Sequence, residues 1–480
     1  MVNIRRPSLR LRPGEHRALL AFGDLIASSA AVLASIFTWY RYSIYTNILN
    51  GMTERQAERL VVINVPVWFY LLPLVWLLLM VELYEPHNAA DRIKTLRGII
   101  IAALVGVLGY SFLFTINVEP NSLPRIGVAA FLIYASLLTI GWRAIYIRFY
   151  STSGMMRRVL IMGAGKAGHT LVDVYSNQKP PPFNLVGFID DDLRKRGKSY
   201  RGFQVLGPTE TLLENLESLN VTNLVVSITG EIKGDTFQAI LDAQERGVEV
   251  TRMPILYEEM TGRVPVHHLE SDWVIRSFVD QLPSSGLYEL AKRFMDFIGG
   301  LVGLVIFAFI FPFASFAILV ESGFPIFYSQ SRLGQGGHVF VIRKFRTMQR
   351  NAEPDGAARL ALEKDPRITK VGLFLRRARL DEFPQFFNVV RGEMSLVGPR
   401  AERPELVLSF QKEIPFYRAR LLVKPGLTGW AQINYGYVSN VTETAVKLEY
   451  DLFYIKHRTL MMDIRIVLRT IGTVFGFRGR

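Results

Sequence analysis

The chain has 480 residues, a length that suggests about three domains. Half of its residues are hydrophobic and 20% are charged, which is too apolar for an ordinary soluble domain and too charged for a pure channel. It contains no cysteine, which excludes disulfides, thiolate metal sites and cysteine nucleophiles. The formal net charge of +14 predicts a polyanionic partner: nucleic acid, anionic lipid or a phosphorylated substrate.

Four apolar runs lie in the first third of the chain. They are Ala18–Tyr40, Leu60–Val81, Gly98–Ile116 and Ile126–Gly141. Each is long enough, or nearly so, to cross a hydrocarbon core of about 30 Å as a helix. The alternative is a set of buried core helices, but four such runs in close succession favour membrane spans. We therefore predict a four-helix transmembrane domain over residues 1–150.

Basic residues around these runs predict their orientation. Arginines precede the first run and follow the fourth, whereas the loop between the third and fourth runs carries only Arg125. The basic positions on the predicted cytoplasmic side include Arg5, Arg6, Arg10, Arg12, Arg143 and Arg148. Because cytoplasmic loops are enriched in Lys and Arg, we expect a cytoplasmic N-terminus and a cytoplasmic chain after Arg143.

Residues 151–282 show strand–helix alternation, which predicts a Rossmann-like α/β domain. The expected strands are Arg158–Met162, Leu185–Ile189, Asn223–Ser227 and Val248–Arg252, and the expected helices are Thr170–Ser176, Glu210–Leu219 and Thr236–Glu245.

A glycine motif follows the first of these strands. In it, Gly163 would allow a tight turn, Gly165 would let a pyrophosphate approach the backbone, and Gly168 would permit close helix–strand packing. Asp190 lies at roughly the spacing of an acid that holds a ribose. The motif predicts a nucleotide site, and the alternative is that the glycines serve the turn alone.

The third predicted domain, residues 283–480, begins with an uncharged run from Phe297 to Val320. Pro312 interrupts this run and removes one helical hydrogen bond. A full crossing would place the C-terminal part outside the cell, whereas a helix broken at Pro312 would enter and leave on one face. Composition alone does not choose between these two arrangements. At the C-terminus, Leu460–Phe475 mixes apolar and basic residues, as a surface-lying amphipathic helix does.

Arginines flank a pair of adjacent carboxylates, Asp381 and Glu382. Arginines beside a carboxylate lower its pKa and also bind phosphate. An ionised carboxylate can attack phosphorus, and its neighbour can serve as a general base or a metal ligand. The alternative is structural, with Asp381 as a helix N-cap and Glu382 as a partner of the helix dipole. No P-loop and no paired histidine spacing for a metal is present, and the basic excess is better assigned to lipid and phosphorylated substrates than to nucleic acid.

A series of motifs follows Lys292 in order. They are Lys292-Arg293-Phe294-Met295-Asp296, Gln330-Ser331-Arg332-Leu333-Gly334, Lys344-Phe345-Arg346-Thr347-Met348, Asp365-Pro366-Arg367, Leu380-Asp381-Glu382-Phe383-Pro384-Gln385, Ser395-Leu396-Val397-Gly398-Pro399-Arg400 and Lys424-Pro425-Gly426-Leu427-Thr428-Gly429. With these motifs the region resembles the bacterial sugar transferase family, the polyprenol-phosphate hexose-1-phosphate transferases. The four apolar runs and the α/β unit resemble the long-form members of that family.

The resemblance implies a mainly helical catalytic domain on a re-entrant helix at about residues 294–320, broken at Pro312. It implies that Asp381 attacks a UDP-sugar to give a sugar-phosphoryl-aspartate, that Glu382 is the helper base, and that Mg²⁺, held by Asp381, balances the diphosphate charge. Candidate phosphate contacts are Arg346, Arg376, Arg400 and Lys424. Thr347 and Ala401-Glu402-Arg403 depart from the usual family pattern. From the position of the anchor, we expect Lys292, Arg293 and Arg332 to face anionic headgroups.

The resemblance further implies undecaprenyl phosphate as the acceptor, UDP-glucose or UDP-galactose as the donor, and a first step in exopolysaccharide, capsule or O-antigen synthesis. It implies a homodimer in the bacterial inner membrane with a cytosolic catalytic domain. Two rival functions stay open. One is a membrane-anchored nucleotide-sugar dehydratase or epimerase, for which Tyr288 and Lys292 have the catalytic Tyr-x-x-x-Lys spacing. The other is a non-catalytic nucleotide-sensing scaffold for polysaccharide assembly.

Overall fold

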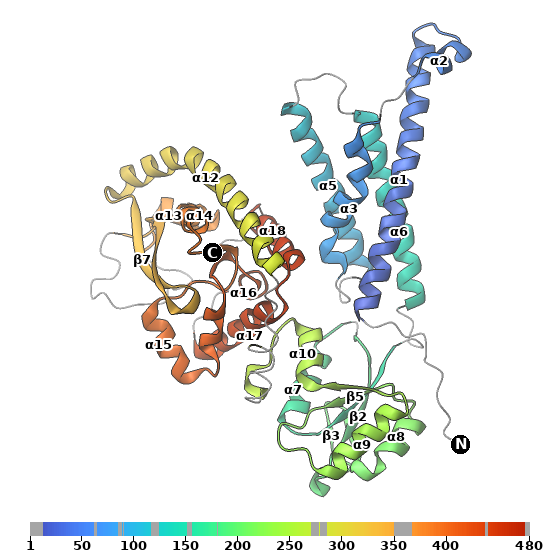
Figure 1. The fold of residues 1–480 in the computed structure, drawn as a ribbon, viewed down its shortest axis with the longest axis vertical. Coiled ribbons are helices and arrows are strands. Elements are labelled where there is room, and N and C mark those ends of the chain that lie inside the picture. The colour runs from blue at the N-terminus through green and yellow to red at the C-terminus, as the bar shows by residue number, and fades with distance from the viewer. Residues whose placement is uncertain are drawn as a thin grey trace. The chain divides into compact units, whose positions relative to one another are not determined.

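The computed structural model describes residues 13–61, 65–84, 89, 91–116, 124–150, 156–179, 181–269, 278, 286–349, 367–436 and 440–475 (Figure 1). Arg5, Arg6, Arg10 and Arg12, the Asp365-Pro366 step and the predicted boundary after residue 282 lie outside this part. The chain forms two compact units. The first contains residues 1–164, 175–226 and 232–250, and the second contains residues 165–174, 227–231 and 251–480.

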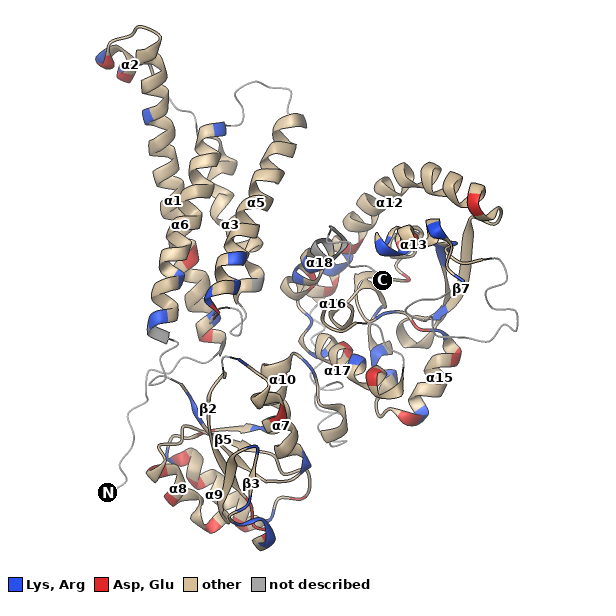
Figure 2. Ribbon diagram, turned by 180° about the vertical axis from the view of Figure 1, so that it is seen from behind, with Lys and Arg blue, Asp and Glu red and all other residues tan. Residues whose placement is uncertain are grey.

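Long apolar helices make up the N-terminal part of the first unit. They are α1 (Pro13–Leu49), α5 (Arg92–Ile116) and α6 (Arg125–Tyr150), and each is long and apolar enough to cross a membrane. Figure 2 shows α5 free of charged residues over most of its length. The remaining elements here are α2 (Glu54–Leu60), η1 (Val67–Leu71), α3 (Leu72–Leu79) and η2 (Val81–Tyr84).

The second predicted span differs from the others in length. Its apolar helix covers Val67–Leu79, and Pro66 and Pro73 mark the starts of its 3₁₀ and α-helical parts. Proline favours a helix start because it has no amide hydrogen to donate. Thirteen residues rise about 20 Å as an α-helix, less than the roughly 30 Å of a hydrocarbon core, so the crossing of the membrane by this segment stays a prediction.

A buried ion pair joins α1 to α6. Asp24 and Arg143 are both almost fully buried, with 2.6 Å between Oδ2 and the guanidinium nitrogen. Arg143 also donates to the carbonyl of Leu83 at 2.7 Å. Charged residues within apolar helices are stable only when paired in this way, so the pair fixes how these two helices face each other.

The predicted α/β domain contains a six-stranded sheet of order β3-β4-β2-β1-β5-β6. The four expected strands correspond to β1, β2, β5 and β6, with ends that differ by at most one residue. Of these, β1 has the predicted bounds and pairs in parallel with β2 and β5. The elements are β1 (Arg158–Met162), α7 (Lys166–Ser176), β2 (Asn184–Ile189), η4 (Leu193–Lys195), β3 (Ser199–Tyr200), β4 (Phe203–Gly207), η5 (Thr209–Thr211), α8 (Leu212–Ser218), β5 (Asn223–Val226), α9 (Gly234–Glu245) and β6 (Glu249–Arg252).

The second unit is built on α12 (Gly286–Ser322), which is α-helical through Pro312 and bowed in Figure 1. One face is buried and contains small residues such as Gly300 and Gly303, where a Cβ atom would overlap Val390 and Phe386. The other face is exposed and apolar, with Leu287 80% and Phe309 73% exposed. The predicted break at Pro312 is therefore a bend within a continuous helix.

The other elements of the second unit are α10 (Met253–Thr261), η6 (Val266–His268), β7 (Phe327–Leu333), η8 (Gln335–Gly337), β8 (Val339–Phe345), α13 (Lys370–Arg377), η9 (Leu380–Gln385), α14 (Phe386–Arg391), β9 (Ser395–Val397), α15 (Pro404–Glu413), η10 (Tyr417–Leu422), β10 (Gly426–Thr428), α16 (Trp430–Asn434), α17 (Val441–His457) and α18 (Leu460–Phe475). Of these, α13, η9, α14, β9 and α18 pack against α12. The last helix has the bounds predicted from its pattern.

Two short sheets position the sequence motifs of this unit. β7 and β8 form an antiparallel hairpin, and β9 pairs in parallel with β10. Beyond β9, Gly398 donates to the carbonyl of Thr428 at 2.9 Å and Gly426 donates to Pro399 at 2.9 Å. A Cβ atom on Gly426 would overlap the amide nitrogen of Gly398. Glycine is therefore needed where the two loops touch, and this contact sets the position of Arg400.

Candidate active site

The two predicted catalytic carboxylates lie side by side on the 3₁₀ helix η9. Arg379, at the N-cap position, has a left-handed backbone with φ of 53°, and this turn carries the chain from α13 into η9. Asp381 follows within the first turn and is buried. Because Arg379 occupies the N-cap, the alternative in which Asp381 caps the helix is wrong.

Glu382 is held by two cations from separate parts of the fold. Lys344 on β8 lies 2.5 Å from Glu382 Oε1, and Arg400, just beyond β9, lies 3.0 Å from the same oxygen. Neighbouring residues of a strand point to opposite faces, so Lys344 shares a face with the buried Phe340 and Ile342. This alternation is the signal that could have identified Lys344, which was not among the predicted site residues.

The two carboxyl groups have opposite pKa shifts. Burial and the neighbouring charge of Glu382 raise the pKa of Asp381 to about 6, against the opposing effect of Lys344, Arg376 and Arg400. Although burial acts in the other direction, Lys344 and Arg400 hold the pKa of Glu382 well below its ordinary value. The expectation that arginines keep the pKa of Asp381 low is therefore wrong, because desolvation and a like charge outweigh them.

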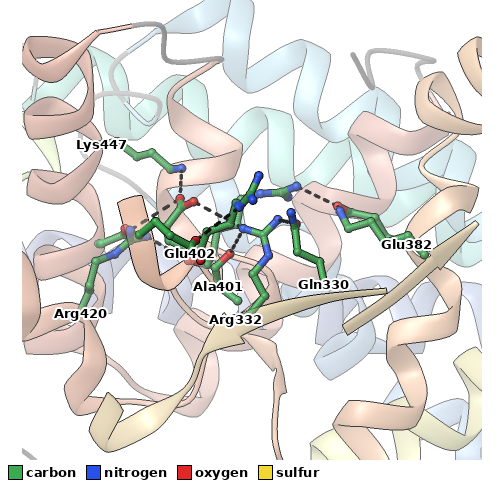
Figure 3. A network of polar contacts seen from close by, with 12 residues as sticks. Gln330, Arg332, Glu382, Ala401, Glu402, Arg420 and Lys447 are labelled. Carbon is green, nitrogen blue, oxygen red and sulfur yellow. Dashed lines mark hydrogen bonds and ion pairs between the residues drawn. The ribbon is translucent and has the colours of Figure 1, made fainter. Parts of the chain in front are cut away.

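A polar network extends from Glu382 through Arg400 to the buried side of the fold (Figure 3). Arg420 donates to the carbonyl of Arg400 at 3.1 Å and pairs with Asp451 on α17 at 2.8 Å. Glu402 lies 3.0 Å from Lys447 and 3.6 Å from Arg420. These ion pairs compensate one another's charge. Through the Arg420 contact to its carbonyl, they hold the backbone of Arg400 in place, while its side chain reaches Glu382.

The other predicted phosphate contacts lie in different surroundings. Arg376 donates to the hydroxyl of Thr347 at 2.9 Å and acts electrostatically on Asp381. The Arg346 guanidinium instead donates to the carbonyls of Ser322 and Gly323 at the end of α12. Lys424 is half-buried in the loop that touches Gly398. Arg376 and Arg400 therefore lie near the carboxylate pair, whereas Arg346 anchors a helix end.

The basic residues at the start of α12 face the protein. Lys292 is buried and donates to Asp463 at 3.0 Å and to the carbonyl of Val397 at 3.2 Å. Arg293 donates to the carbonyls of Val389 and Val390. The prediction that these two residues face lipid headgroups is wrong, because their charges are used to fasten the helix.

Arg332 and Tyr288 are also engaged within the fold. Arg332 donates to the carbonyl of Ala401 at 3.0 Å, so it too faces the protein. Tyr288 donates to Asp463 at 3.1 Å, the carboxylate that Lys292 also binds. The Tyr-x-x-x-Lys spacing is thus used for packing α12, which disfavours the dehydratase or epimerase alternative.

The carboxylate pair is compatible with a Mg²⁺ ion that arrives with a diphosphate. The described residues contain no group of three or more side chains with metal-binding chemistry. Mg²⁺ commonly uses only one or two carboxylates together with substrate phosphates. Glu382 already pairs with the side chains of Lys344 and Arg400, so Asp381 is the carboxylate that could better hold a Mg²⁺ ion.

In the α/β domain, Asp190 binds its own glycine loop. The amide of Ala164 donates to Asp190 Oδ2 at 2.7 Å, and Lys195 lies 2.8 Å from the same oxygen. Although burial raises the pKa of Asp190, these contacts lower it overall. Gly163 has φ of 106°, a Cβ atom at Gly165 would meet nothing within 4 Å, and Gly168 is buried on α7. Nucleotide binding at this loop stays a prediction.

We expect Lys344→Met to destabilise the protein by about 2 kcal/mol, because it leaves the partly buried Glu382 charge with one cation fewer. The double variant Lys344→Met/Glu382→Gln should lose clearly less than the sum of the single losses. Denaturant unfolding of the purified protein measures these values. Lys412→Met, an exposed Lys-to-Met change on α15, should stay within about 0.5 kcal/mol of the parent. Additive losses in the double variant would contradict the pairing.

Comparison with known proteins identifies two domains. The model of the bacterial sugar transferase family matches residues 287–477, and that of a CoA-binding domain family matches residues 80–243. The chain is 39% identical over 234 residues to the UDP-N-acetylgalactosamine-undecaprenyl-phosphate N-acetylgalactosaminephosphotransferase of Aeromonas hydrophila, covering 48% of this chain and 54% of that protein.

Two glucose-1-phosphate transferases match over a longer region. The UDP-glucose:undecaprenyl-phosphate glucose-1-phosphate transferase of Xanthomonas campestris pv. campestris is 31% identical, covering 69% of each chain. The protein of the same name in Escherichia coli (strain K12) is 31% identical, covering 66% of this chain and 67% of its own. With its motifs in order and this length of similarity, the chain belongs to the bacterial sugar transferase family.

Proposed function

We propose that this protein transfers a hexose-1-phosphate from a UDP-sugar to undecaprenyl phosphate and releases UMP. The observation that carries the proposal is the pair of a buried Asp381 and a partly buried Glu382 with Lys344 and Arg400 beside it. A diphosphate needs cations at its oxygens, and a phosphorus atom needs an ionised nucleophile. The relatives named above carry out sugar-phosphate transfer to undecaprenyl phosphate, as their names state.

Asp381 is the proposed nucleophile. With a pKa of about 6, its carboxylate is largely ionised at neutral pH and more basic than an ordinary aspartate. One carboxylate oxygen forms a bond to the β-phosphorus of the UDP-sugar while the bond from that phosphorus to the bridging oxygen breaks. UMP leaves with the bonding electrons. An oxygen of undecaprenyl phosphate then attacks the same phosphorus and releases Asp381.

Glu382 is better suited to hold cations than to remove protons. Its pKa is depressed by Lys344 and Arg400, which makes it a weak base. The acceptor also needs no base, because a phosphate monoester with a second pKa near 6 is largely ionised at neutral pH. Glu382 thus orients Lys344 and Arg400 toward the substrate phosphates. A Mg²⁺ ion held by Asp381 and the diphosphate would further neutralise phosphate charge.

The contacts of α12 support a helix that enters and leaves on one face of the membrane. Near its start, Asp296 accepts from Ser395 and from the amide of Leu396, both at 2.9 Å. At its end, Glu321 accepts from the amides of Lys370 and Val371. If α12 crossed the bilayer, one folded unit could not bind both ends. These contacts support a catalytic unit on one side of the membrane, and the basic residues before the first apolar run and after the fourth favour the cytosolic side of a bacterial inner membrane.

The donor sugar and the assembly state are part of this proposal. UDP-glucose and UDP-galactose remain the favoured donors, and UDP-N-acetylgalactosamine joins the panel because of the Aeromonas relative. The product would begin exopolysaccharide, capsule or O-antigen synthesis, and a homodimer is the expected assembly.

The first test is a burst of UMP. Purified protein in lipid discs, given Mg²⁺ and the matching UDP-sugar but no acceptor, should release about one UMP per active site and then stop. Added undecaprenyl phosphate should restore turnover. Asp381→Asn should abolish the burst while the protein remains folded. A burst of equal size in Asp381→Asn would contradict the nucleophile, and silence of the folded parent across the donor panel would favour the scaffold function.

The burst rate should depend on pH through Asp381. Because the pKa of this group is raised to about 6, the carboxyl becomes protonated below that pH and the rate should fall about tenfold per pH unit. Glu382→Gln removes a like charge and should move this fall to lower pH, whatever its effect on the maximum rate. Measurement without acceptor avoids the titration of undecaprenyl phosphate itself. A fall centred near pH 4 in the parent would contradict the raised pKa.

The absence of cysteine allows a direct test of topology. We expect Gly286→Cys and Phe324→Cys, at the two ends of α12, to resist a membrane-impermeant maleimide in intact spheroplasts and to react in inverted vesicles. Met52→Cys, in the turn between α1 and α2, should react in spheroplasts and serves as the control. Labelling of only one end of α12 from outside would show that this helix crosses the membrane.

A further inference from the structure

A small cavity lies beside the carboxylate pair. It has room for a single water-sized group, about 10 Å³. Its walls come from β7, β8, η9 and the loops around β9 and β10. The lining residues that matter here are Arg332, Lys344, Glu382, Gln385 and Arg400. The cavity therefore adjoins the place where a substrate phosphate would meet the predicted machinery.

Two hydrogen-bond donors at this cavity have no acceptor within the described residues. They are Nε2 of Gln385 and Nε of Arg332. Gln385 is only 5% exposed, so water outside the protein does not solvate its amide freely. A buried donor without a partner lowers stability, and native folds tolerate few such groups. Two of them on one cavity point to an acceptor that arrives with a ligand.

The rest of each side chain is already held in place. The terminal nitrogens of Arg332 donate to the carbonyl of Ala401 at 3.0 Å and to Gln330 Oε1 at 2.6 Å (Figure 3). Gln385 ends η9, directly before α14 begins at Phe386. The Arg332 guanidinium is thus fixed before any ligand binds, which lowers the entropy cost of binding, and Gln385 is fixed at its backbone.

Charge identifies the kind of acceptor. Arg332, Lys344 and Arg400 bring three positive charges to the cavity walls, Glu382 brings one negative charge, and the carboxylate of Glu402 lies 3.8 Å from Arg332. The positive excess favours an anionic oxygen over a neutral sugar hydroxyl. The small space between these side chains suits one oxygen atom.

We propose that Gln385 Nε2 and Arg332 Nε together bind one non-bridging phosphoryl oxygen of the UDP-sugar diphosphate. The inference rests on the proposed transfer reaction and adds two substrate-binding residues to it. The competing assignment is a structural water in the same cavity, which would make both donors irrelevant to substrate affinity.

The test replaces the Gln385 amide with an apolar group of similar shape. Gln385→Met should raise the KM for the UDP-sugar by about 10- to 100-fold, the range expected for a lost hydrogen bond to a charged group, with a smaller change in kcat. Its thermal midpoint without substrate should not fall, because the parent gains nothing from the unpaired donor. The matched control is Gln432→Met on α16, where the side-chain amide is also buried without a partner but lies away from this cavity. The control should keep the parent KM.

Two further measurements separate the outcomes. The inhibition constant of UDP, which lacks the sugar, should rise in parallel with KM in Gln385→Met. A rise in KM alone would assign the contact to the sugar and overturn the phosphoryl assignment. An unchanged KM, with or without a lower thermal midpoint, would assign the cavity to a structural water.

If Gln385→Met does not fold, Gln385→Glu and Arg332→Lys provide the same comparison, and parent KM values in both would overturn the proposal. Parent protein that releases no UMP would refute the transfer reaction itself.

Discussion

Two adjacent carboxylates in a buried position are the constraint on which the second unit depends. Asp381 and Glu382 repel each other and lose hydration, so the fold must supply positive charge close to them. That charge comes from Lys344 on a hairpin and from Arg400 on a loop between two short parallel strands. Neither cation is near the carboxylates in sequence. The hairpin, the two glycine-rich loops and the network around Arg420 can all be understood as what brings these charges together.

The division of charge within the pair has a chemical consequence. The cations bind Glu382 directly, while Asp381 is left with a raised pKa. In the proposed reaction this makes the two carboxylates unequal: one is a permanent anion that holds cations, and the other is a nucleophile of increased basicity. A pair with equal pKa values would share a proton, and neither carboxylate would then be fully ionised as the anion that holds cations or as the nucleophile. The asymmetry follows from geometry alone, because Lys344 and Arg400 meet the same oxygen of Glu382.

Sequence patterns predicted the elements with strong periodicity and the motifs with unusual composition. Arg158–Met162 and Leu460–Phe475 appear with the predicted bounds, and Asp381, Glu382 and Arg400 come together as expected. Lys344 was missed because its role depends on which face of β8 is buried. The prediction that the pKa of Asp381 is lowered was wrong, because the local sequence shows nearby arginines but does not show burial.

The fate of the basic residues explains why net charge is a coarse guide to function. The excess of +14 predicts a polyanionic partner, yet it could not say which cations would meet one. Lys292, Arg293 and Arg346 are bound to carbonyl oxygens or a carboxylate of the protein and fasten the two ends of α12. A cation that has a protein partner stabilises the fold, whereas an unpaired donor on a side chain that lines a cavity with excess positive charge is a candidate ligand contact. By that criterion the unpaired nitrogens of Arg332 and Gln385 are more informative about substrate binding than the arginine-rich stretch that first drew attention to the site.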